Sequence, residues 1–331
     1  MHILEEIREV AVSKNVNFLI GSGCSVGAID RMSKYWEDAW RERNINEDKK
    51  EKSPTCCKDK EYCDECKQRG NDLLIEDVKR VSKMILEKDE NTEEANLKKI
   101  QDVSKAYIYF VQEAISLMNR MNSRQTPRNI NIFTTNYDLF IENALDEVSK
   151  AETFVINDGA RGYFRRVLDS SNFNRTVSYR GPSNNYVDEI PSISLIKPHG
   201  SVNWEKVGNH NIEIKAEVVD TPVIVKPDGH ESRSVFEENY FNEALRIFES
   251  ELGKTQSILF VIGFSFQDRH IVQMMRRALK NRELNVYVFS YSNEGMVGIL
   301  NNLDYERPLG NLKFVCPVDI SNNKKNRKVN N

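Results

Sequence analysis

Short apolar segments that end in turns recur along the chain, and this pattern constrains the fold more than any other feature. They lie at 16–20, 129–134, 193–196, 223–225, 258–262, 286–289 and 312–315. Helical patterns separate several of them, at 139–150, 237–252 and 268–282. Strands that are apolar along nearly their whole length and alternate with helices are typical of a parallel sheet covered on both faces. We therefore expect an α/β fold with a Rossmann-like parallel sheet.

A long segment near the N-terminus lacks this alternation. Residues 31–127 combine repeated charges with apolar residues at helical spacing, and a long helical pattern covers 97–122. We predict a helical insertion there. The rest is expected to divide into one α/β domain, built from 1–30 and 128–320, and a polar, disordered tail at 321–331.

The composition limits the cellular compartments and the classes of partner that we expect for the chain. The chain has 331 residues, of which 29% are charged, and a formal net charge of -3. This charge predicts no particular attraction to nucleic acids or anionic membranes. No apolar segment approaches the ~18 residues that a membrane-spanning helix needs, and residues 1–14 lack the apolar centre of a signal peptide. We therefore expect a cytoplasmic protein without membrane contact or direct nucleic-acid binding.

The first apolar segment ends in a glycine-rich turn, GSGCS at 21–25. Glycines allow backbone N–H groups to approach an anion closely, and the N-terminus of a following helix would add a favourable dipole. The full dinucleotide fingerprint is not present, because Gly27 falls one position late. An ordinary strand–turn–helix junction therefore explains the motif as readily as a phosphate site does.

A second motif, TTNYD at 134–138, follows the next apolar segment. Open α/β sheets bind ligands at the carboxyl ends of their strands, which is where these polar residues should lie. Asn136 can donate and accept hydrogen bonds, whereas an ionised Asp138 only accepts. The same two residues could instead cap the helix that follows.

Two further motifs also close apolar segments. KPHGS at 197–201 places His199 on a turn, where it could transfer protons near neutral pH. A lone histidine is more often structural. The other motif, GFSFQDRH at 263–270, offers Ser265 as a phosphate or ribose ligand and Asp268 as a helix N-cap.

The four motifs stand in the order found in sirtuin-like domains, and Trp204 follows shortly after KPHGS as it does there. The chain especially resembles the sirtuin-like NADases of bacterial antiphage defence systems, over roughly 15–30 and 128–320. The resemblance implies NAD as substrate. It implies catalytic roles for Asn136, Asp138 and His199, with His199 as the base. The residues that it implies for dinucleotide binding are Gly21, Ser22, Gly23, Ser25, Gly263, Ser265 and, where sirtuins usually place an Asn, Ser290.

Departures from protein-deacylating sirtuins narrow the activity. Those enzymes carry a zinc ribbon with two CxxC pairs after the catalytic histidine, whereas only Cys316 follows His199 here. Their GIPDFR-like stretch is replaced by GAIDRM at 27–32. We therefore expect hydrolysis of NAD to ADP-ribose and nicotinamide, with antiphage NAD depletion as its purpose. A protein deacylase and a sensor that binds NAD or an ADP-ribose derivative without turnover remain alternatives.

A cysteine cluster lies inside the predicted insertion, formed by Cys56, Cys57, Cys63 and Cys66. Four thiolates can hold a structural zinc ion, and Cys63-x-x-Cys66 has the spacing of one half-site. The adjacent Cys56 and Cys57 fit a second half-site poorly, so reduced, solvent-facing thiols also explain the cluster. Both interpretations remain open.

Partners follow from the resemblance and from a simple biological constraint. An unregulated enzyme that empties a cell of NAD would be toxic, so we expect control by a trigger. Defence relatives of this size often work with a HerA-type ATPase, which makes such an ATPase a candidate partner. The resemblance and the apolar helical surface of the insertion also predict a homo-oligomer.

Overall fold

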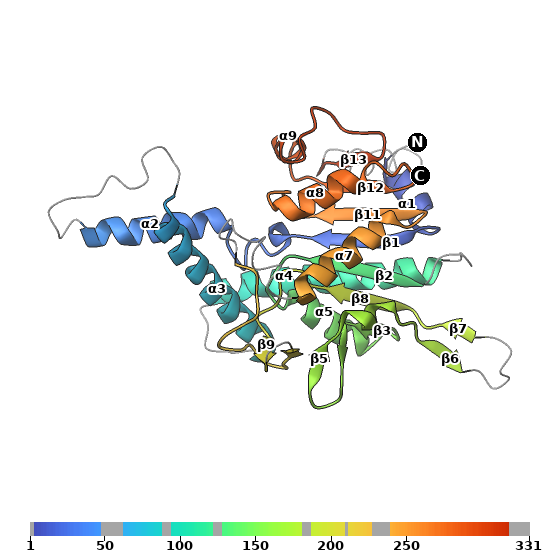
Figure 1. Cartoon of the computed structure of the whole chain (residues 1–331), viewed down its shortest axis with the longest axis horizontal. Helices are drawn as coiled ribbons and strands as arrows, with labels where there is room; N and C mark the ends of the chain where they lie inside the picture. The colour runs from blue at the N-terminus through green and yellow to red at the C-terminus, as the bar shows by residue number, and fades with distance from the viewer. Residues whose placement is uncertain are drawn as a thin grey trace.

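A parallel sheet organises the molecule. The computed structural model describes residues 3–47, 62–87, 94–121, 128–180, 187–208, 211–226 and 239–317. In these residues seven strands form the large sheet, in the order β13 (Leu312–Val315), β12 (Asn285–Phe289), β11 (Ser257–Ile262), β1 (Asn15–Ile20), β2 (Asn129–Thr134), β8 (Ser192–Ile196) and β3 (Val155–Asn157) (Figure 1). Every neighbouring pair is parallel. The predicted α/β fold with a Rossmann-like parallel sheet is confirmed.

One predicted strand is wrong. Residues 223–225 contribute only a single antiparallel bridge, between Ile224 and Gly200. The N–H of Val225 donates to the carbonyl of His199 at 2.9 Å, so this segment follows the turn after β8. It cannot join the large sheet beside β8, because β2 and β3 already pair with both edges of that strand.

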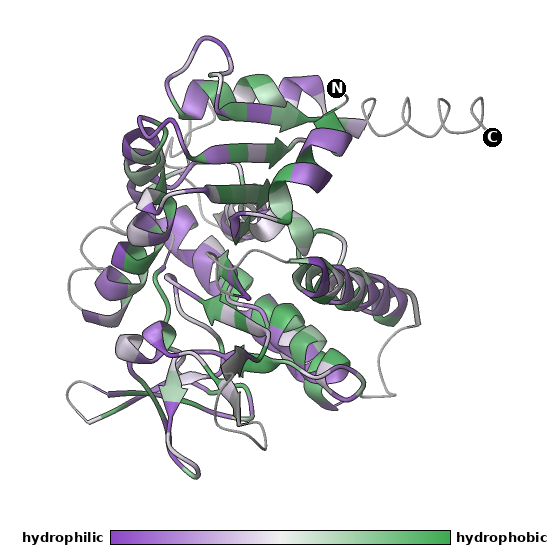
Figure 2. Ribbon diagram, turned by 90° about the vertical axis from the view of Figure 1, so that its right-hand side faces the viewer, coloured by the Kyte–Doolittle hydropathy of each residue, from purple (hydrophilic) through white to green (hydrophobic). Residues whose placement is uncertain are grey.

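Helices cover both faces of the sheet. One face packs against α1 (Ile3–Ala11), α4 (Glu94–Arg120) and α5 (Phe140–Ser149), and the other against α7 (Asn239–Gly253), α8 (Arg269–Ala278) and α9 (Asn293–Asn302). The helices carry both hydrophobic and hydrophilic stretches, as expected for elements with one buried side (Figure 2).

Alternate residues of the strands serve the two faces. In β1, Phe18 and Ile20 join the core under α4, whereas Leu19 joins the core under α7. Because both sides are buried, the strand is apolar apart from Asn15 and Asn17, and this mostly apolar segment is the sequence pattern that predicted it.

The described chain between β1 and β2 contains helices joined by turns and irregular segments, and no strand. It contains the one-turn helix η1 (Ser22–Cys24), α2 (Met32–Glu47), α3 (Asp64–Glu87) and α4. Helices α2 and α3 pack on each other and extend away from the sheet (Figure 1). Helix α4 instead packs on the sheet, where Val111 and Met118 are fully buried. One helix of the predicted insertion therefore contributes to the main core.

Smaller strands occupy the chain between α5 and α7. An antiparallel sheet has the order β4 (Ala160–Arg161), β5 (Arg166–Leu168), β10 (Asn211–Ile214) and β9 (Trp204–Val207), with η3 (Ser170–Asn174) after β5. A separate hairpin pairs β6 (Ser178–Arg180) with β7 (Val187–Glu189). The turn between β4 and β5 carries Tyr163 and Phe164, whose exposed fractions are 88% and 93%.

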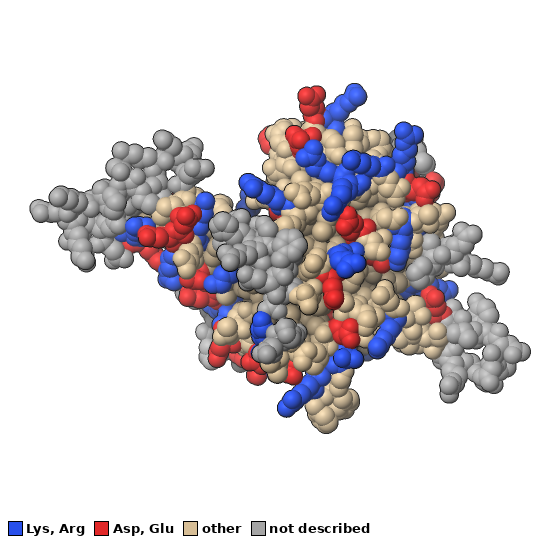
Figure 3. All heavy atoms as spheres, in the orientation of Figure 1, with Lys and Arg blue, Asp and Glu red and all other residues tan. Residues whose placement is uncertain are grey.

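The surface carries mixed charge. Basic and acidic side chains are interspersed over the face that Figure 3 shows, in line with the net charge of -3. Among the described residues, no helix has the length and hydrophobicity needed to span a membrane. The predicted disordered tail, 321–331, lies outside the described residues.

Candidate active site

The four motifs meet at one edge of the sheet, where β11, β1, β2 and β8 end side by side. Backbone and side-chain hydrogen bonds join their turns. The N–H of Gly21 donates to the carbonyl of Ile262 at 3.0 Å, and Asn136 Nδ2 donates to the carbonyl of Gly21 at 3.2 Å. The N–H of Val202 donates to the carbonyl of Tyr137 at 3.1 Å. The motifs therefore form one connected cluster, as the parallel topology predicts.

Glycines allow two of these turns to pack in backbone contact. A Cβ on Gly21 would lie 2.5 Å from the carbonyl oxygen of Gly263, and one on Gly23 would lie 2.8 Å from its Cα. Gly263 itself has a φ of 65°, in the left-handed region that favours glycine. The turn continues into the single turn η1, and α2 begins only at Met32. The helix that follows this turn is therefore only the single turn η1, which adds little of the dipole that the sequence suggested.

Most backbone donors of the first turn are already used. The N–H groups of Gly21, Gly23, Cys24 and Ser25 all donate to backbone carbonyls of the two glycine turns or of β11, at 2.9–3.1 Å. Ser22 is exposed, whereas Ser25 is buried. Of these residues, Ser22 is therefore the one best placed to meet a bound anion.

Asn136 is buried and oriented by three oxygens. Its Nδ2 lies 3.2 Å from the carbonyl of Gly21, 3.3 Å from Ser25 Oγ and 3.4 Å from the hydroxyl of Tyr107. Its Oδ1 is buried and has no hydrogen-bond partner among the described residues. Buried polar atoms are rarely left in this state. The arrangement presents Asn136 as a hydrogen-bond acceptor.

Asp138 is buried beside it. One carboxylate oxygen accepts from Ser25 Oγ at 2.8 Å, and the other accepts from the N–H of Phe140 at 3.3 Å, at the start of α5. Burial raises the pKa of Asp138, and the charge of Lys197 lowers it in part. The N-cap of α5 is Leu139, so neither Asn136 nor Asp138 is the cap; one oxygen of Asp138 still accepts from the first N–H of the helix, while the other belongs to the cluster.

A buried lysine hydrogen-bonds to the turn after β2. Lys197 is only 2% exposed, and its Nζ donates to the backbone oxygen of Asp138, to Glu142 Oε1 and to Ser201 Oγ at 2.7, 2.7 and 2.9 Å. All three protons of the ammonium are thus used. Burial raises the pKa of Glu142, an effect that Lys197 opposes.

His199 pairs with a carboxylate from the last motif. Its Nε2 lies 2.8 Å from Asp268 Oδ2, and both side chains are about one-tenth exposed, at 11% and 10%. The other oxygen of Asp268 accepts from the N–H groups of His270 and Ile271 at the start of α8. Burial would raise the pKa of Asp268, but the His199 contact and these N–H groups outweigh it, so the pKa is lowered. The predicted N-cap is confirmed, and the same carboxylate orients the histidine.

The remaining predicted residues lie at the same edge with different exposure. Ser265 is exposed, next to Phe266, which is buried with a φ of 57° and packs on Phe264. Such a left-handed, non-glycine residue stores strain and is found at functional turns. Ser290 is buried, and its hydroxyl donates to the carbonyl of Ser292 at 2.7 Å. Ser265 therefore faces solvent, whereas Ser290 is engaged within its own turn.

Sequence reasoning missed three side chains of the cluster, those of Tyr107, Glu142 and Lys197, and the pairing role of Asp268. Lys197 stands inside the KPHGS motif, so its position was visible although its role was not. Tyr107 lies in an uninterrupted helical pattern of the predicted insertion and carried no local signal.

The cysteines give no metal site within the described part of the chain, where no group of three or more His, Cys, Asp or Glu is suited to a metal ion. Cys56 and Cys57 lie outside the described residues, while Cys66 is buried and Cys63 is partly exposed. The zinc site stays a prediction. Near the cluster, burial raises the pKa of Cys24 to about 12, which makes it a poor nucleophile.

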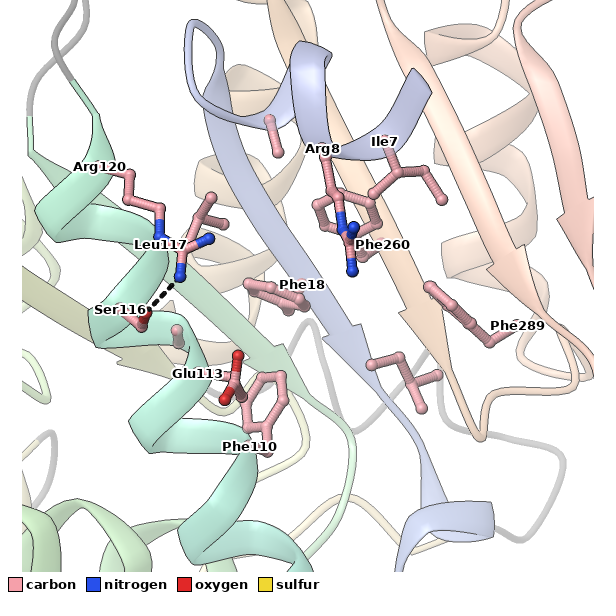
Figure 4. A pocket seen from close by; sticks show the side chains of 13 residues that line it. Ile7, Arg8, Phe18, Phe110, Glu113, Ser116, Leu117, Arg120, Phe260 and Phe289 are labelled. Atoms are coloured by element: carbon pink, nitrogen blue, oxygen red, sulfur yellow. Dashed lines mark hydrogen bonds between the residues drawn. The ribbon is translucent and has the colours of Figure 1, made fainter. Parts of the chain in front are cut away.

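Two hollows among the described residues lack the chemistry of the site. One, of about 560 Å³, is largely apolar and lies between α1, α4 and the strands (Figure 4). The other, of about 650 Å³, is polar and lies between residues 27–30, α2 and α3. Neither is lined by Asn136 or His199. The hydrogen-bonded cluster, rather than these hollows, is therefore the candidate active site.

One family model matches the part of the chain that carries three of the four motifs. A model of the SIR2-like domain family matches residues 130–309, just over half of the chain. The matched segment begins in β2 and contains the motifs around Asn136, His199 and Gly263. Among curated proteins, no sequence matches this chain. Members of the SIR2-like family are generally NAD-dependent enzymes. The chain belongs to the SIR2-like domain family.

Proposed function

We propose that the chain binds NAD across the carboxyl ends of β11, β1 and β2 and hydrolyses the nicotinamide–ribose bond to give ADP-ribose and nicotinamide. The observation that carries this proposal is the buried Asn136, whose Oδ1 has no partner among the described residues and lies in the same cluster as the glycine turns. In this proposal 1–30 and 128–320 form the NAD-binding domain, and 31–127 is inserted into it.

Cleavage of the nicotinamide–ribose bond needs no general acid. The ring nitrogen of nicotinamide is cationic in NAD, so the C1′–N bond breaks with its electron pair going to that nitrogen, and nicotinamide leaves as a neutral molecule. The transition state should resemble an oxocarbenium ion, as in glycoside hydrolysis. A water molecule then forms the new C1′–O bond and gives up a proton. The site must therefore hold the ribose, position the water and accept that proton.

The cluster offers a residue to position the water, one to accept the proton and one to stabilise charge on the ribose. Asn136 Oδ1 can accept a hydrogen bond from the attacking water and so fix its position. His199 can take the proton, and Asp268 can orient its ring and stabilise the imidazolium that forms. Asp138 adds a carboxylate whose negative charge favours the developing positive charge on the ribose.

The direct test is turnover of NAD by the purified chain, followed by chromatography of both products. We expect nicotinamide and ADP-ribose in equal amounts, with and without an acylated peptide. A deacylase would release nicotinamide only with the peptide and would form O-acyl-ADP-ribose. Binding of NAD without products, also in the presence of candidate partners, would identify a sensor and contradict the proposal.

The biological purpose is proposed from the resemblance. Depletion of NAD would stop the metabolism of an infected cell, which suits an antiphage effector, and a HerA-type ATPase is the candidate partner that would control it. Measuring NAD in cells that express the chain with and without that ATPase, before and after infection, tests both points. An NAD level that never changes would contradict them.

Self-association completes the proposal. Tyr163 and Phe164 pack edge to face at the tip of the β4–β5 turn, yet are about nine-tenths exposed. Aromatic side chains of this kind are enriched in protein interfaces. We expect light scattering to give a homo-oligomer whose mass falls when both are replaced by Ser. A monomer across micromolar concentrations of the wild-type chain would contradict self-association.

A further inference from the structure

Tyr107 reaches the site from a part of the chain that carries none of the motifs. It lies in α4, yet its hydroxyl is 3.0 Å from Ser25 Oγ and 3.4 Å from Asn136 Nδ2. The side chain is buried, with 5% of the residue exposed, and its ring stacks on Phe140 at 5.5 Å between centroids and 6° between planes. The stacking fixes the ring independently of the hydroxyl.

The hydrogen bonds around Ser25 run in one direction. Ser25 Oγ donates its only proton to Asp138 Oδ2 at 2.8 Å. The contact between Ser25 and Tyr107 must then be donated by the phenol, because Ser25 has no second proton. Burial raises the pKa of Tyr107 well above its usual value, so the phenol keeps its proton. The chain of donors is therefore Tyr107 to Ser25 to Asp138.

This chain bears on the orientation of Asn136. Its amide group faces three oxygens, those of Gly21, Ser25 and Tyr107. A rotated amide would place Oδ1 against the carbonyl of Gly21, where two acceptors repel each other. With Nδ2 held on this side, Oδ1 is turned to the other side, where it lacks a partner among the described residues.

We propose that Tyr107 is a positioning residue, which holds the Asn136 amide and the Ser25–Asp138 pair in the arrangement that turns Oδ1 toward the attacking water. The inference rests on the proposed NAD hydrolysis and adds to it a role for the helical insertion. Because α4 also packs into the sheet core, it acts as a rigid support for the catalytic amide. A shift of α4 along the sheet would therefore disturb Asn136 although none of the four motifs is altered.

The test is Tyr107→Phe, which keeps the stacked ring and removes only the hydroxyl. We expect kcat for nicotinamide release to fall at least tenfold, within the roughly 10²-fold that misplacement by ~1 Å can cost. The KM and the calorimetric Kd for NAD should change less than threefold. Tyr287→Phe is the matched control, because that buried tyrosine also donates its hydroxyl proton to a side chain, the carboxylate of Glu6, but lies away from the cluster. It should match Tyr107→Phe in melting temperature and keep wild-type kcat.

A double variant shows whether Tyr107 acts through Ser25. Tyr107→Phe combined with Ser25→Ala should be no slower than Ser25→Ala alone, because residues that act as a unit are not additive. Wild-type kcat in Tyr107→Phe, while the unaltered chain cleaves NAD, would overturn this inference and leave the proposed function standing. An equal loss of kcat in Tyr287→Phe would also overturn it. A wild-type chain that neither binds nor cleaves NAD would overturn both.

Discussion

The site has two halves built around the same residue type in opposite settings. On the β2 side, Asp138 is buried among Ser25, Tyr107 and Asn136, and burial raises its pKa. On the β11 side, Asp268 contacts His199 and two N–H groups of α8, and its pKa is lowered. The difference follows from the deeper burial of Asp138 and from the close contact of Asp268 with His199 and two N–H groups. One half is suited to orienting an amide, and the other to supporting a base.

The largest expected effect on stability comes from the support of the β2 half. Lys197→Met leaves the Glu142 carboxylate without its cation. We expect a loss of about 3 kcal/mol in the free energy of unfolding, at the low end of the range for a broken buried pair, because Glu142 is partly exposed. Chemical denaturation measures it. Lys197→Met with Glu142→Gln should recover part of the loss, and a loss below about 0.5 kcal/mol, typical of surface changes, would contradict the role of the pair.

Asp268→Asn separates the two tasks of the β11 half. Asn is as good an N-cap as Asp, so α8 should keep its start and the melting temperature should change little. The His199 ring loses its charged partner, and we expect kcat to fall roughly 10²-fold, a loss typical of general-base support. Steady-state nicotinamide release checks this. Asp268→Ala should lose the cap as well, and an Asp268→Asn enzyme with wild-type kcat would reduce Asp268 to a cap.

The smallest effect is a difference in pH dependence between the two halves. The raised pKa of Asp138 adds stability that is complete below the unfolded value near ~4 and is lost as pH rises through the folded pKa. The lowered pKa of Asp268 adds stability present above ~4 and lost as pH falls through its folded value.

The wild-type free energy of unfolding, referred to Asp138→Asn, should therefore fall with rising pH. The difference in free energy of unfolding between the wild-type chain and Asp268→Asn should rise with pH and then level off. Urea unfolding over a pH series measures both slopes. Slopes of the same sign would remove the contrast between the halves.

The sequence could predict those features that depend on residues close together in the chain. Strands buried on both faces are mostly apolar, so β1, β2, β8, β11, β12 and β13 were visible as local patterns. Their carboxyl ends had to meet at one edge, which brought Asn136 and His199 into one predicted site. The segment 223–225 was equally apolar, but its sheet position was already filled, and a local pattern carries no such information.

The contacts that refine the site are long-range. Tyr107 and Ser25 are 82 residues apart, and their contact depends on how α4 returns to the sheet. The pairing of His199 with Asp268 joins the turns after β8 and β11, which β1 and β2 separate in the sheet, and local patterns do not encode such a contact. Asp268 showed only its local role, the helix cap.

The central claim, NAD hydrolysis by Asn136 and His199, is tested most directly by nicotinamide release from Asn136→Ala and His199→Ala beside the wild-type chain. We expect each variant to lose roughly 10²–10⁴-fold in kcat, to keep the wild-type melting temperature and to bind NAD still. The double variant should be little slower than either single one, because the two residues serve the same water molecule. Near-wild-type NAD cleavage by His199→Ala would contradict the account and leave the cluster as a binding site alone.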